Sequence, residues 1–218
     1  AYGNEMFFKS DGSPRVFAVF PRSVQATGKK QTVRLIGVNL PAAIKAADIS
    51  FASNSIKAES LKRIDDSSIS LEVSAPSESS SGPINISVQG VACDEKVIVY
   101  NKLDAIRIFP ALGRARVSSG AAYPPQGVQY VARGVDYGPD GKPDTADDLI
   151  LEPVEADWWL EEEKTRENDD DLEYLQASIV NGLYTPVTTY APIETRYQRL
   201  GGIGLIAVGA SYKSGTQE

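Results

Sequence analysis

The chain has 218 residues, 42% of them hydrophobic and 23% charged, values typical of a folded protein with room for two domains. Its net charge is −7, from 22 Lys and Arg against 29 Asp and Glu. The sequence has no histidine and one cysteine, Cys93. These absences exclude a Ser-His-Asp triad, a histidine-ligated metal, an intramolecular disulfide and a c-type haem attachment motif, and they favour a binding or structural protein.

Short β-strands are predicted along the first half of the chain. Residues 16–20 form an apolar run that stops at Pro21, and residues 32–38 follow a Gly-containing turn. Apolar and polar residues alternate over 69–74 and 84–88, and residues 97–99 are apolar. About seven such strands over roughly 85 residues predict an immunoglobulin-like sandwich, which we place at residues 1–102, ordered from about residue 15. We expect Cys93 to be a small buried side chain on a strand.

The second half, residues 103–218, predicts another β-sandwich domain with acidic loop insertions. Strands are expected over residues 105–109, 128–132, 149–160 and 203–210. Residues 161–171 carry two acidic runs and follow no helical period, which predicts a solvated loop or a short helical insertion. The fold class is therefore all-β, with two immunoglobulin-like β-sandwich domains in tandem.

Membranes and nucleic acids are not predicted as partners. No stretch approaches the roughly 20 apolar residues that span a bilayer. An acidic chain without a basic stripe is repelled by phosphate groups. The first five residues lack the basic and apolar regions of a signal peptide, so we expect that any export leader has been removed.

The first candidate site is the loop at residues 136–148, which is rich in Gly and Pro. Carboxylates are ligands that Ca²⁺ prefers, and Gly141 lets the backbone turn so that a carbonyl can join them. The spacing differs from that of an EF-hand, and the alternative is a solvated hairpin whose Asp side chains bind neighbouring backbone amides. Both interpretations stay open. The five candidate ligands are Asp136, Asp140, Asp144, Asp147 and Asp148.

The second candidate site is the pair Trp158 and Trp159, the only tryptophans in the sequence. Neighbouring residues on a strand point to opposite faces, so one ring can fill the core while the other must be covered by a loop, a partner or a ligand. We consider a core residue with loop cover, an interface anchor and a platform for stacking a sugar.

Two further patterns do not predict a site. The acidic runs at residues 161–163 and 169–171 offer many carboxylates, but nothing singles out the spaced pair that a glycosidase needs, so a solvated face is favoured. The glycine-rich residues 201–204 precede a predicted strand and lack the Lys-Ser/Thr of a phosphate loop, which argues against nucleotide binding.

The first half of the chain resembles an IPT/TIG-type immunoglobulin domain. That family opens with a strand, a turn and a second strand that ends in Gly-x-Asn-Leu. The matching residues here are Phe20-Pro21, Gly28, Thr32-Val33, Ile36-Gly37 and Asn39-Leu40. Residues 81–88 resemble the later hairpin of the family.

The join between the halves resembles the stretch that links the last two domains of the quinohemoprotein amine dehydrogenase alpha subunit. The resemblance covers about residues 15–210. Its matching positions are residues 99–108, Pro110, residues 115–117, 130–132, 140–141 and 145–148, Trp158, and residues 182–186.

This resemblance implies a structural role. In that family a cysteine tryptophylquinone in a small gamma subunit oxidises the amine, and c-type haems in the N-terminal domain of the alpha subunit take the electrons. No haem or quinone role carries over to any residue here, so the chain is expected to hold no cofactor unless calcium binds the acidic loop. We expect a non-catalytic, periplasmic or otherwise extracytoplasmic module that docks quinone-bearing and haem-bearing subunits. The alternative is a free-standing extracellular adhesion or carbohydrate-binding protein that calcium stabilises.

Overall fold

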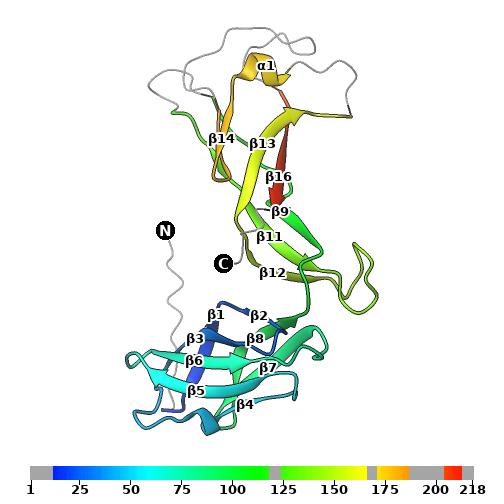
Figure 1. Cartoon of the computed structure of the whole chain (residues 1–218). Coiled ribbons are helices and arrows are strands. Elements are labelled where there is room, and N and C mark those ends of the chain that lie inside the picture. The colour runs from blue at the N-terminus through cyan, green and yellow to red at the C-terminus, as the bar shows by residue number, and fades with distance from the viewer. Residues whose placement is uncertain (1–11, 118–123, 166–170, 187–203, 213–218) are drawn as a thin grey trace. The chain divides into compact units, whose positions relative to one another are not determined.

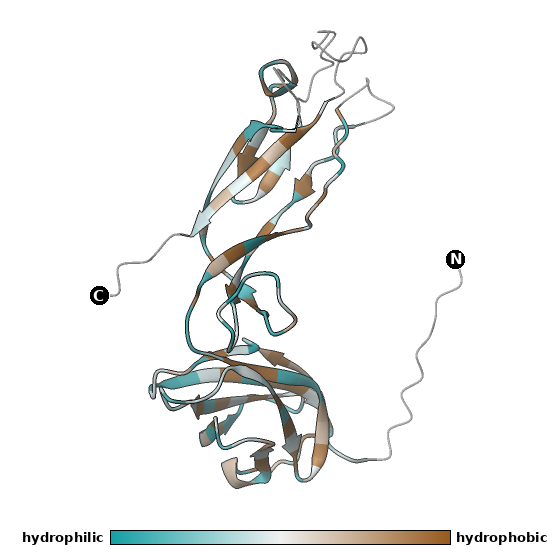
Figure 2. Ribbon diagram, turned by 90° about the vertical axis from the view of Figure 1, so that its right-hand side faces the viewer, coloured by the Kyte–Doolittle hydropathy of each residue, from teal (hydrophilic) through white to brown (hydrophobic). Residues whose placement is uncertain are grey.

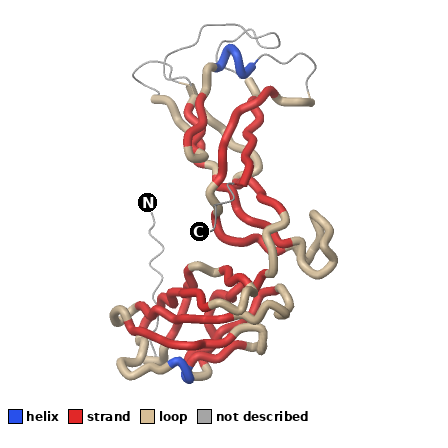
Figure 3. Tube along the Cα trace, in the orientation of Figure 1, coloured by secondary structure: helices blue, strands red, loops and turns tan. Residues whose placement is uncertain are grey.

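A computed structural model gives the fold and describes residues 12–117, 124–165, 171–186 and 204–212 (Figure 1). The described residues are mostly β-strand, with one 3-10 turn and one five-residue helix (Figure 3). Neither helical element has the length or apolar character needed to cross a bilayer. The chain divides into two compact units. Unit 1 comprises Ala1–Lys102 and Asp136–Glu152, and unit 2 comprises Leu103–Val135 and Pro153–Glu218.

Unit 1 is a sandwich of two four-stranded sheets. Its elements are β1 (Arg15–Phe20), β2 (Ser23–Gln25), β3 (Lys30–Val38), η1 (Ala46–Asp48), β4 (Ile49–Phe51), β5 (Lys57–Arg63), β6 (Ser68–Ser74), β7 (Gly82–Val88) and β8 (Val91–Tyr100). One sheet has the order β1-β3-β6-β5 and the other β2-β8-β7-β4. All pairs are antiparallel except β2 with β8, which is parallel.

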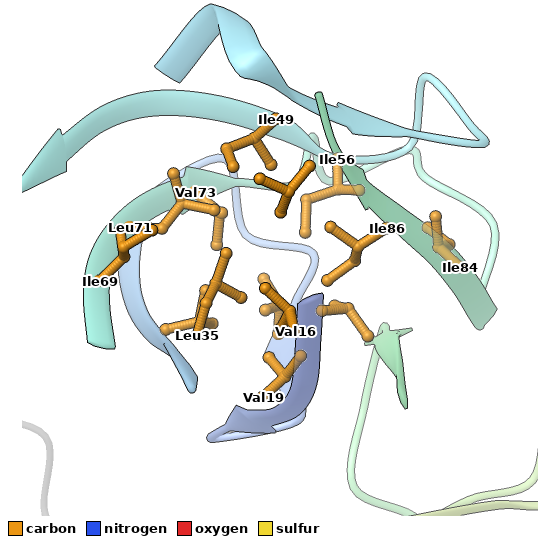
Figure 4. Close-up of a cluster of buried hydrophobic side chains, with 14 of the residues drawn as sticks. Val16, Val19, Leu35, Ile49, Ile56, Ile69, Leu71, Val73, Ile84 and Ile86 are labelled. Carbon is orange, nitrogen blue, oxygen red and sulfur yellow. The ribbon is translucent and has the colours of Figure 1, made fainter. Parts of the chain in front are cut away.

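The core of unit 1 follows from the alternation of apolar residues along these strands. Ile69, Leu71 and Val73 on β6 are all fully buried, whereas Ser70 and Glu72 between them are only partly buried. They meet side chains of the opposite sheet, including Ile84 and Ile86 of β7, in one hydrophobic cluster (Figure 4). The same alternation appears as brown bands along the strands in Figure 2. Burial of these Val, Leu and Ile side chains stabilises the fold by about 1.5–3 kcal/mol each.

The Gly-x-Asn-Leu motif at the end of β3 has a structural cause. A Cβ atom at Gly37 would lie 2.1 Å from the carbonyl oxygen of Arg15 on the neighbouring strand, so only glycine fits there. Asn39 takes a positive φ of 54°, which asparagine tolerates better than most residues. Leu40 then enters the core with 4% of its surface exposed.

Unit 2 is built from shorter strands and the helix α1. Its elements are β9 (Ala105–Phe109), β10 (Val128–Gln129), β11 (Val131–Asp136), β13 (Ala156–Glu162), α1 (Asp171–Leu175), β14 (Ser178–Val180), β15 (Leu183–Thr185) and β16 (Ile206–Tyr212). Strand β9 pairs with β11, β13 pairs with β16, and a third sheet has the order β10-β15-β14. Strand β12 (Leu149–Pro153) follows the acidic loop.

The hairpin of β14 and β15 turns on Asn181 and Gly182. Their φ values are 49° and 76°, and Val180 pairs directly with Leu183. Two positive φ values in a two-residue loop are typical of a type I′ turn, which Asn-Gly favours. The sequence analysis did not predict this hairpin, although the Asn-Gly pair is a recognised signal for it.

Most predicted strands are confirmed, with three differences. Residues 149–160 form two strands, β12 and β13, because residues between them interrupt the pairing. Residues Asp136–Glu152, which hold the acidic loop and most of β12, group with unit 1, whereas all of residues 103–218 were predicted to form the second domain. In the acidic stretch 161–171, β13 continues to Glu162 and α1 begins at Asp171, while residues 166–170 lie outside the described part of the chain.

Candidate functional site

The acidic loop is fixed to the rest of unit 1 through Asp136, which is 1% exposed. Its Oδ2 atom accepts hydrogen bonds from the backbone amide of Asn101 at 2.9 Å and from the hydroxyl of Ser81 at 3.1 Å. Its Oδ1 atom accepts a bond from the amide of Gly138 at 2.8 Å. Asp136 therefore anchors the start of the loop to the end of β8 and to the segment before β7.

The other carboxylates of the loop bind its own backbone and Thr145. The Thr145 hydroxyl lies 2.8 Å from Oδ1 of Asp147, and the amide of Asp140 donates to Oδ2 of Asp147 at 3.3 Å. These two bonds, the Thr145 bond first, hold the pKa of Asp147 below its ordinary value. Asp148 accepts a bond from the amide of Asp144 at 3.0 Å. This is the pattern of the solvated hairpin alternative.

No group of three or more carboxylate or cysteine side chains suited to a metal ion occurs in the part of the chain that the structure describes. Asp136 is turned toward Asn101 and Ser81, and the remaining four aspartates share hydrogen bonds within the loop. Calcium binding at Asp136, Asp140, Asp144, Asp147 and Asp148 therefore stays a prediction from the sequence.

The two tryptophans lie on β13, and their rings pack against different glycines. An added Cβ at Gly182 would lie 3.1 Å from Cζ2 of Trp158, and one at Gly209 would lie 2.2 Å from Cε2 of Trp159. Trp159 is 43% exposed, and Trp158 is partly buried. The predicted opposite orientation is thus observed. An interface role for either ring stays a prediction.

A cavity of about 440 Å³ lies inside unit 2. No charged side chain is among the described residues that line it, and Ile108, Val128, Tyr130, Tyr184, Leu205 and Val208 are part of the lining. Burial raises the pKa of both Tyr130 and Tyr184 above the ordinary tyrosine value. Both phenols therefore stay protonated at neutral pH, and the cavity wall is uncharged.

Cys93 lies on β8 and is partly buried against the core of unit 1, somewhat less than the buried position that we expected. Burial, and then the negative charge of Asp94, raises the pKa of the thiol to about 11. A thiol with so high a pKa is a weak nucleophile at neutral pH.

The two halves of the chain match one family. Residues 13–101 match domain III, and residues 106–218 match domain IV, of "Quinohemoprotein amine dehydrogenase, alpha subunit". The chain belongs to this family. The predicted resemblance is confirmed, and the boundary between the two matched domains lies within residues 101–106.

Among curated proteins none matches this alpha-subunit chain in sequence. Several solved structures are distantly similar. Domains 5–6 of the S-layer protein SbsC are 18% identical, with 81% of this chain and 86% of that chain covered and a TM-score of 0.29. InvD of Yersinia pseudotuberculosis is 12% identical, with 92% and 53% covered and a TM-score of 0.29. The Escherichia coli adhesin FdeC is 12% identical, with 89% and 62% covered and the same TM-score. Likenesses this weak support no inference about function.

The cofactors of the amine dehydrogenase family do not fit the residues of this alpha-subunit chain. A c-type haem needs a Cys-x-x-Cys-His motif, and the sequence has a single cysteine and no histidine. The carboxylates of the acidic runs that the structure describes have local partners. Glu162 accepts bonds from the amide of Leu172 at 3.0 and 3.1 Å, Glu163 binds Thr165, and Asp171 accepts a bond from the amide of Leu205 at 2.8 Å. These carboxylates join elements of unit 2.

Proposed function

We propose that this chain is a non-catalytic structural module of a periplasmic, amine dehydrogenase-like complex, and that it docks the subunits that carry haem and quinone. The observation that carries this proposal is the match of residues 13–101 and 106–218, in that order, to domains III and IV of one alpha subunit. A subunit of a multisubunit oxidoreductase needs surfaces that bind its partners as well as residues that carry electrons. In this proposal the chain supplies surfaces that bind partners, and it lacks the residues that carry electrons.

The chemistry of the side chains supports the absence of catalysis. Proton transfer near neutral pH most often uses histidine, and the sequence has none. The single thiol has a pKa of about 11 and is mostly protonated. Two acidic side chains of unit 2, Glu162 and Asp171, hold backbone amides in place.

Reconstitution tests this proposal. The purified chain is mixed with the haem-bearing N-terminal domain of the alpha subunit and the quinone-bearing subunit of a related amine dehydrogenase, and complex formation is followed by size-exclusion chromatography with light scattering. We expect co-elution with those subunits, and no amine-dependent reduction of an electron acceptor by the chain alone. An unrelated immunoglobulin-like sandwich of the same net charge serves as the control. Failure to co-elute, or amine oxidation by the chain alone, would overturn the proposal.

The exposed ring of Trp159 supports a second candidate function, a free-standing extracellular adhesion or carbohydrate-binding protein. Sugar rings stack on exposed aromatic side chains of such proteins. Titration of a broad panel of oligosaccharides, followed by tryptophan fluorescence, tests this candidate. Saturable quenching that the variant Trp159→Ala abolishes would favour it over docking, and flat curves across the panel would remove it.

A further inference from the structure

We propose that one face of the β13–β16 ribbon binds a basic segment of a partner protein, with an Arg or Lys side chain stacked on Trp159 between the carboxylates of Asp157 and Glu161. This inference rests on the proposed docking function and names the surface and the chemistry of the partner.

The register of the ribbon defines this face, and Figure 1 shows β13 and β16 side by side. Residues directly opposite each other in an antiparallel pair carry their side chains on the same face, and every second residue along a strand shares that face. Asp157, Trp159 and Glu161 of β13 therefore lie on one face. Their partners on β16 are respectively Ser211, Gly209 and Ala207. We call these six residues the Trp159 face.

The small residues of β16 determine how the indole lies. A Cβ at Gly209 would lie within 2.2–2.5 Å of three atoms of the Trp159 ring. The ring therefore covers the Gly209 backbone at contact distance, where any larger residue would displace it. With 43% of Trp159 exposed, the side of the ring away from Gly209 is open to a ligand. The result is an aromatic platform held by its own ribbon.

The charges on the Trp159 face select a cation. Asp157 and Glu161 lie two residues before and two residues after Trp159, so a carboxylate lies on each side of the ring along the strand. A cation over an indole is attracted to its π face, and neighbouring carboxylates add to that attraction. Ionised carboxylates only accept hydrogen bonds, whereas guanidinium and ammonium groups only donate them, so the two sets are complementary.

Among the described residues, Lys164 lies near this face. Lys164 pairs with Glu161 at 3.2 Å, with 78% and 39% of the two side chains exposed. An ion pair so open to solvent contributes little, so a partner cation displaces it at small cost. A sugar is the weaker candidate for this face, because sugar hydroxyl groups need donors as well as acceptors. The side-chain donors among the six residues are the hydroxyl of Ser211 and the indole N–H of Trp159, and that N–H lies against the Gly209 backbone.

The two indole N–H signals in a ¹⁵N NMR spectrum of the full chain test the proposal, with the variant Trp159→Phe assigning them. The probe is a short peptide of alternating Gly and Arg, compared with a Gly-Glu peptide of the same length and with a neutral oligosaccharide. We expect the Arg peptide to shift the Trp159 signal in a saturable, salt-sensitive manner and to leave the Trp158 signal unchanged. No shift at millimolar peptide, or equal shifts with the Gly-Glu peptide, would overturn the proposal. A shift with the oligosaccharide alone would assign the face to carbohydrate.

A charge variant separates this site from general acidity. The double variant Asp157→Asn/Glu161→Gln should lower the affinity for the Arg peptide by about threefold to tenfold. The control Glu78→Gln/Glu173→Gln removes two charges from exposed positions elsewhere and should change binding by less than about twofold. Equal losses of peptide affinity in the two variants would show that the Trp159 face is not the binding site.

The peptide and reconstitution experiments fail separately. If the chain co-elutes with the subunits but the Arg peptide does not bind, the Trp159 face is not the docking surface and the docking function stands. If the peptide binds but the subunits do not co-elute, the docking function fails instead.

Discussion

Asp136 and Asn101 lie 35 residues apart in the sequence and are joined by a hydrogen bond of 2.9 Å from the Asn101 amide to the Asp136 carboxylate. The bond ties the start of the acidic loop to the end of β8. With Ser81 and Gly138 as further donors, Asp136 satisfies three groups of unit 1 at a position that is almost fully buried. Asp136 therefore anchors the start of the loop, and its role as a calcium ligand stays a prediction.

The variant Asp136→Ala should lower the free energy of unfolding by about 2–4 kcal/mol, because buried amide donors lose their acceptor. The variant Asp136→Asn keeps one acceptor oxygen and should lower the free energy of unfolding by less than Asp136→Ala does. Denaturation in urea, followed by circular dichroism, measures both. The variant Glu78→Ala is the control. Glu78 is exposed, and in the described structure its side chain is bonded only to Ser77. We expect the free energy of unfolding to change by about 0.5 kcal/mol or less. An Asp136→Ala variant as stable as this control would contradict the anchoring role.

Strands in which apolar and polar residues alternate clearly were predicted from the sequence, and strands without this alternation were missed. Ile69, Leu71 and Val73 alternate with polar residues, and they lie on β6, the strand between β3 and β5. Strand β5 was missed because Ala58 and Leu61 are the only apolar residues of Lys57–Arg63. As an edge strand it buries little, so its composition stays polar.

The candidate sites were predicted less well than the strands, because their geometry depends on distant residues. The sequence placed Asp136 among four other aspartates, but its partners, Asn101 just after β8 and Ser81 just before β7, lie 35 and 55 residues away along the chain. For Trp159 the decisive neighbour is Gly209, and strand pairing across fifty residues brings the two together. Alternation alone showed that the tryptophans point apart, and it could not show which ring stays exposed.

The core of unit 1 offers a direct test of the sandwich. Leu71 is fully buried on β6, where it pairs with Val33 on one side and Leu61 on the other. Leu71→Ala should therefore destabilise unit 1 by about 2–5 kcal/mol through lost burial and the cavity left behind. Ile64→Ala, at a residue that is 50% exposed, is the matched control and should cost about 1 kcal/mol or less. Similar urea midpoints for the two variants would show that Leu71 is not in a packed core.

Cys93 should react slowly with thiol reagents. At a pKa of about 11, roughly 0.1% of the thiol is ionised at pH 8, whereas an ordinary cysteine is about one quarter ionised. We expect labelling by a disulfide reagent to be more than about tenfold slower in the native chain than in the urea-unfolded chain. The native rate should also keep rising up to pH 10. Equal native and unfolded rates at pH 8 would contradict the burial of this side chain.

Asp65 should titrate below its ordinary pKa. Its Oδ1 accepts bonds from the amide and the hydroxyl of Ser67, both at 2.8 Å, and these bonds, the amide first, lower the pKa. The stabilisation is present above the pKa of the unfolded chain, and it is lost as the pH falls through the lower pKa of the folded chain. An NMR titration should show the shift and its partial reversal in Ser67→Ala. The variant Ser77→Ala, which removes a hydroxyl from a different carboxylate, should leave it unchanged. An Asp65 pKa at or above its ordinary value would refute this account.

Calcium provides the last test, because the sequence leaves two interpretations of the acidic loop open, a solvated hairpin and a calcium site. Asp147 is held by Thr145 and by the Asp140 amide, so calcium would have to replace bonds that already exist. We therefore expect 5 mM CaCl₂ and 5 mM EDTA to give melting temperatures within about 1 °C of each other, since only a ligand bound to the native state raises stability. Asp147→Asn should not change this small difference. A rise of about 5 °C with calcium that Asp147→Asn abolishes would instead establish the metal site that the five aspartates suggested.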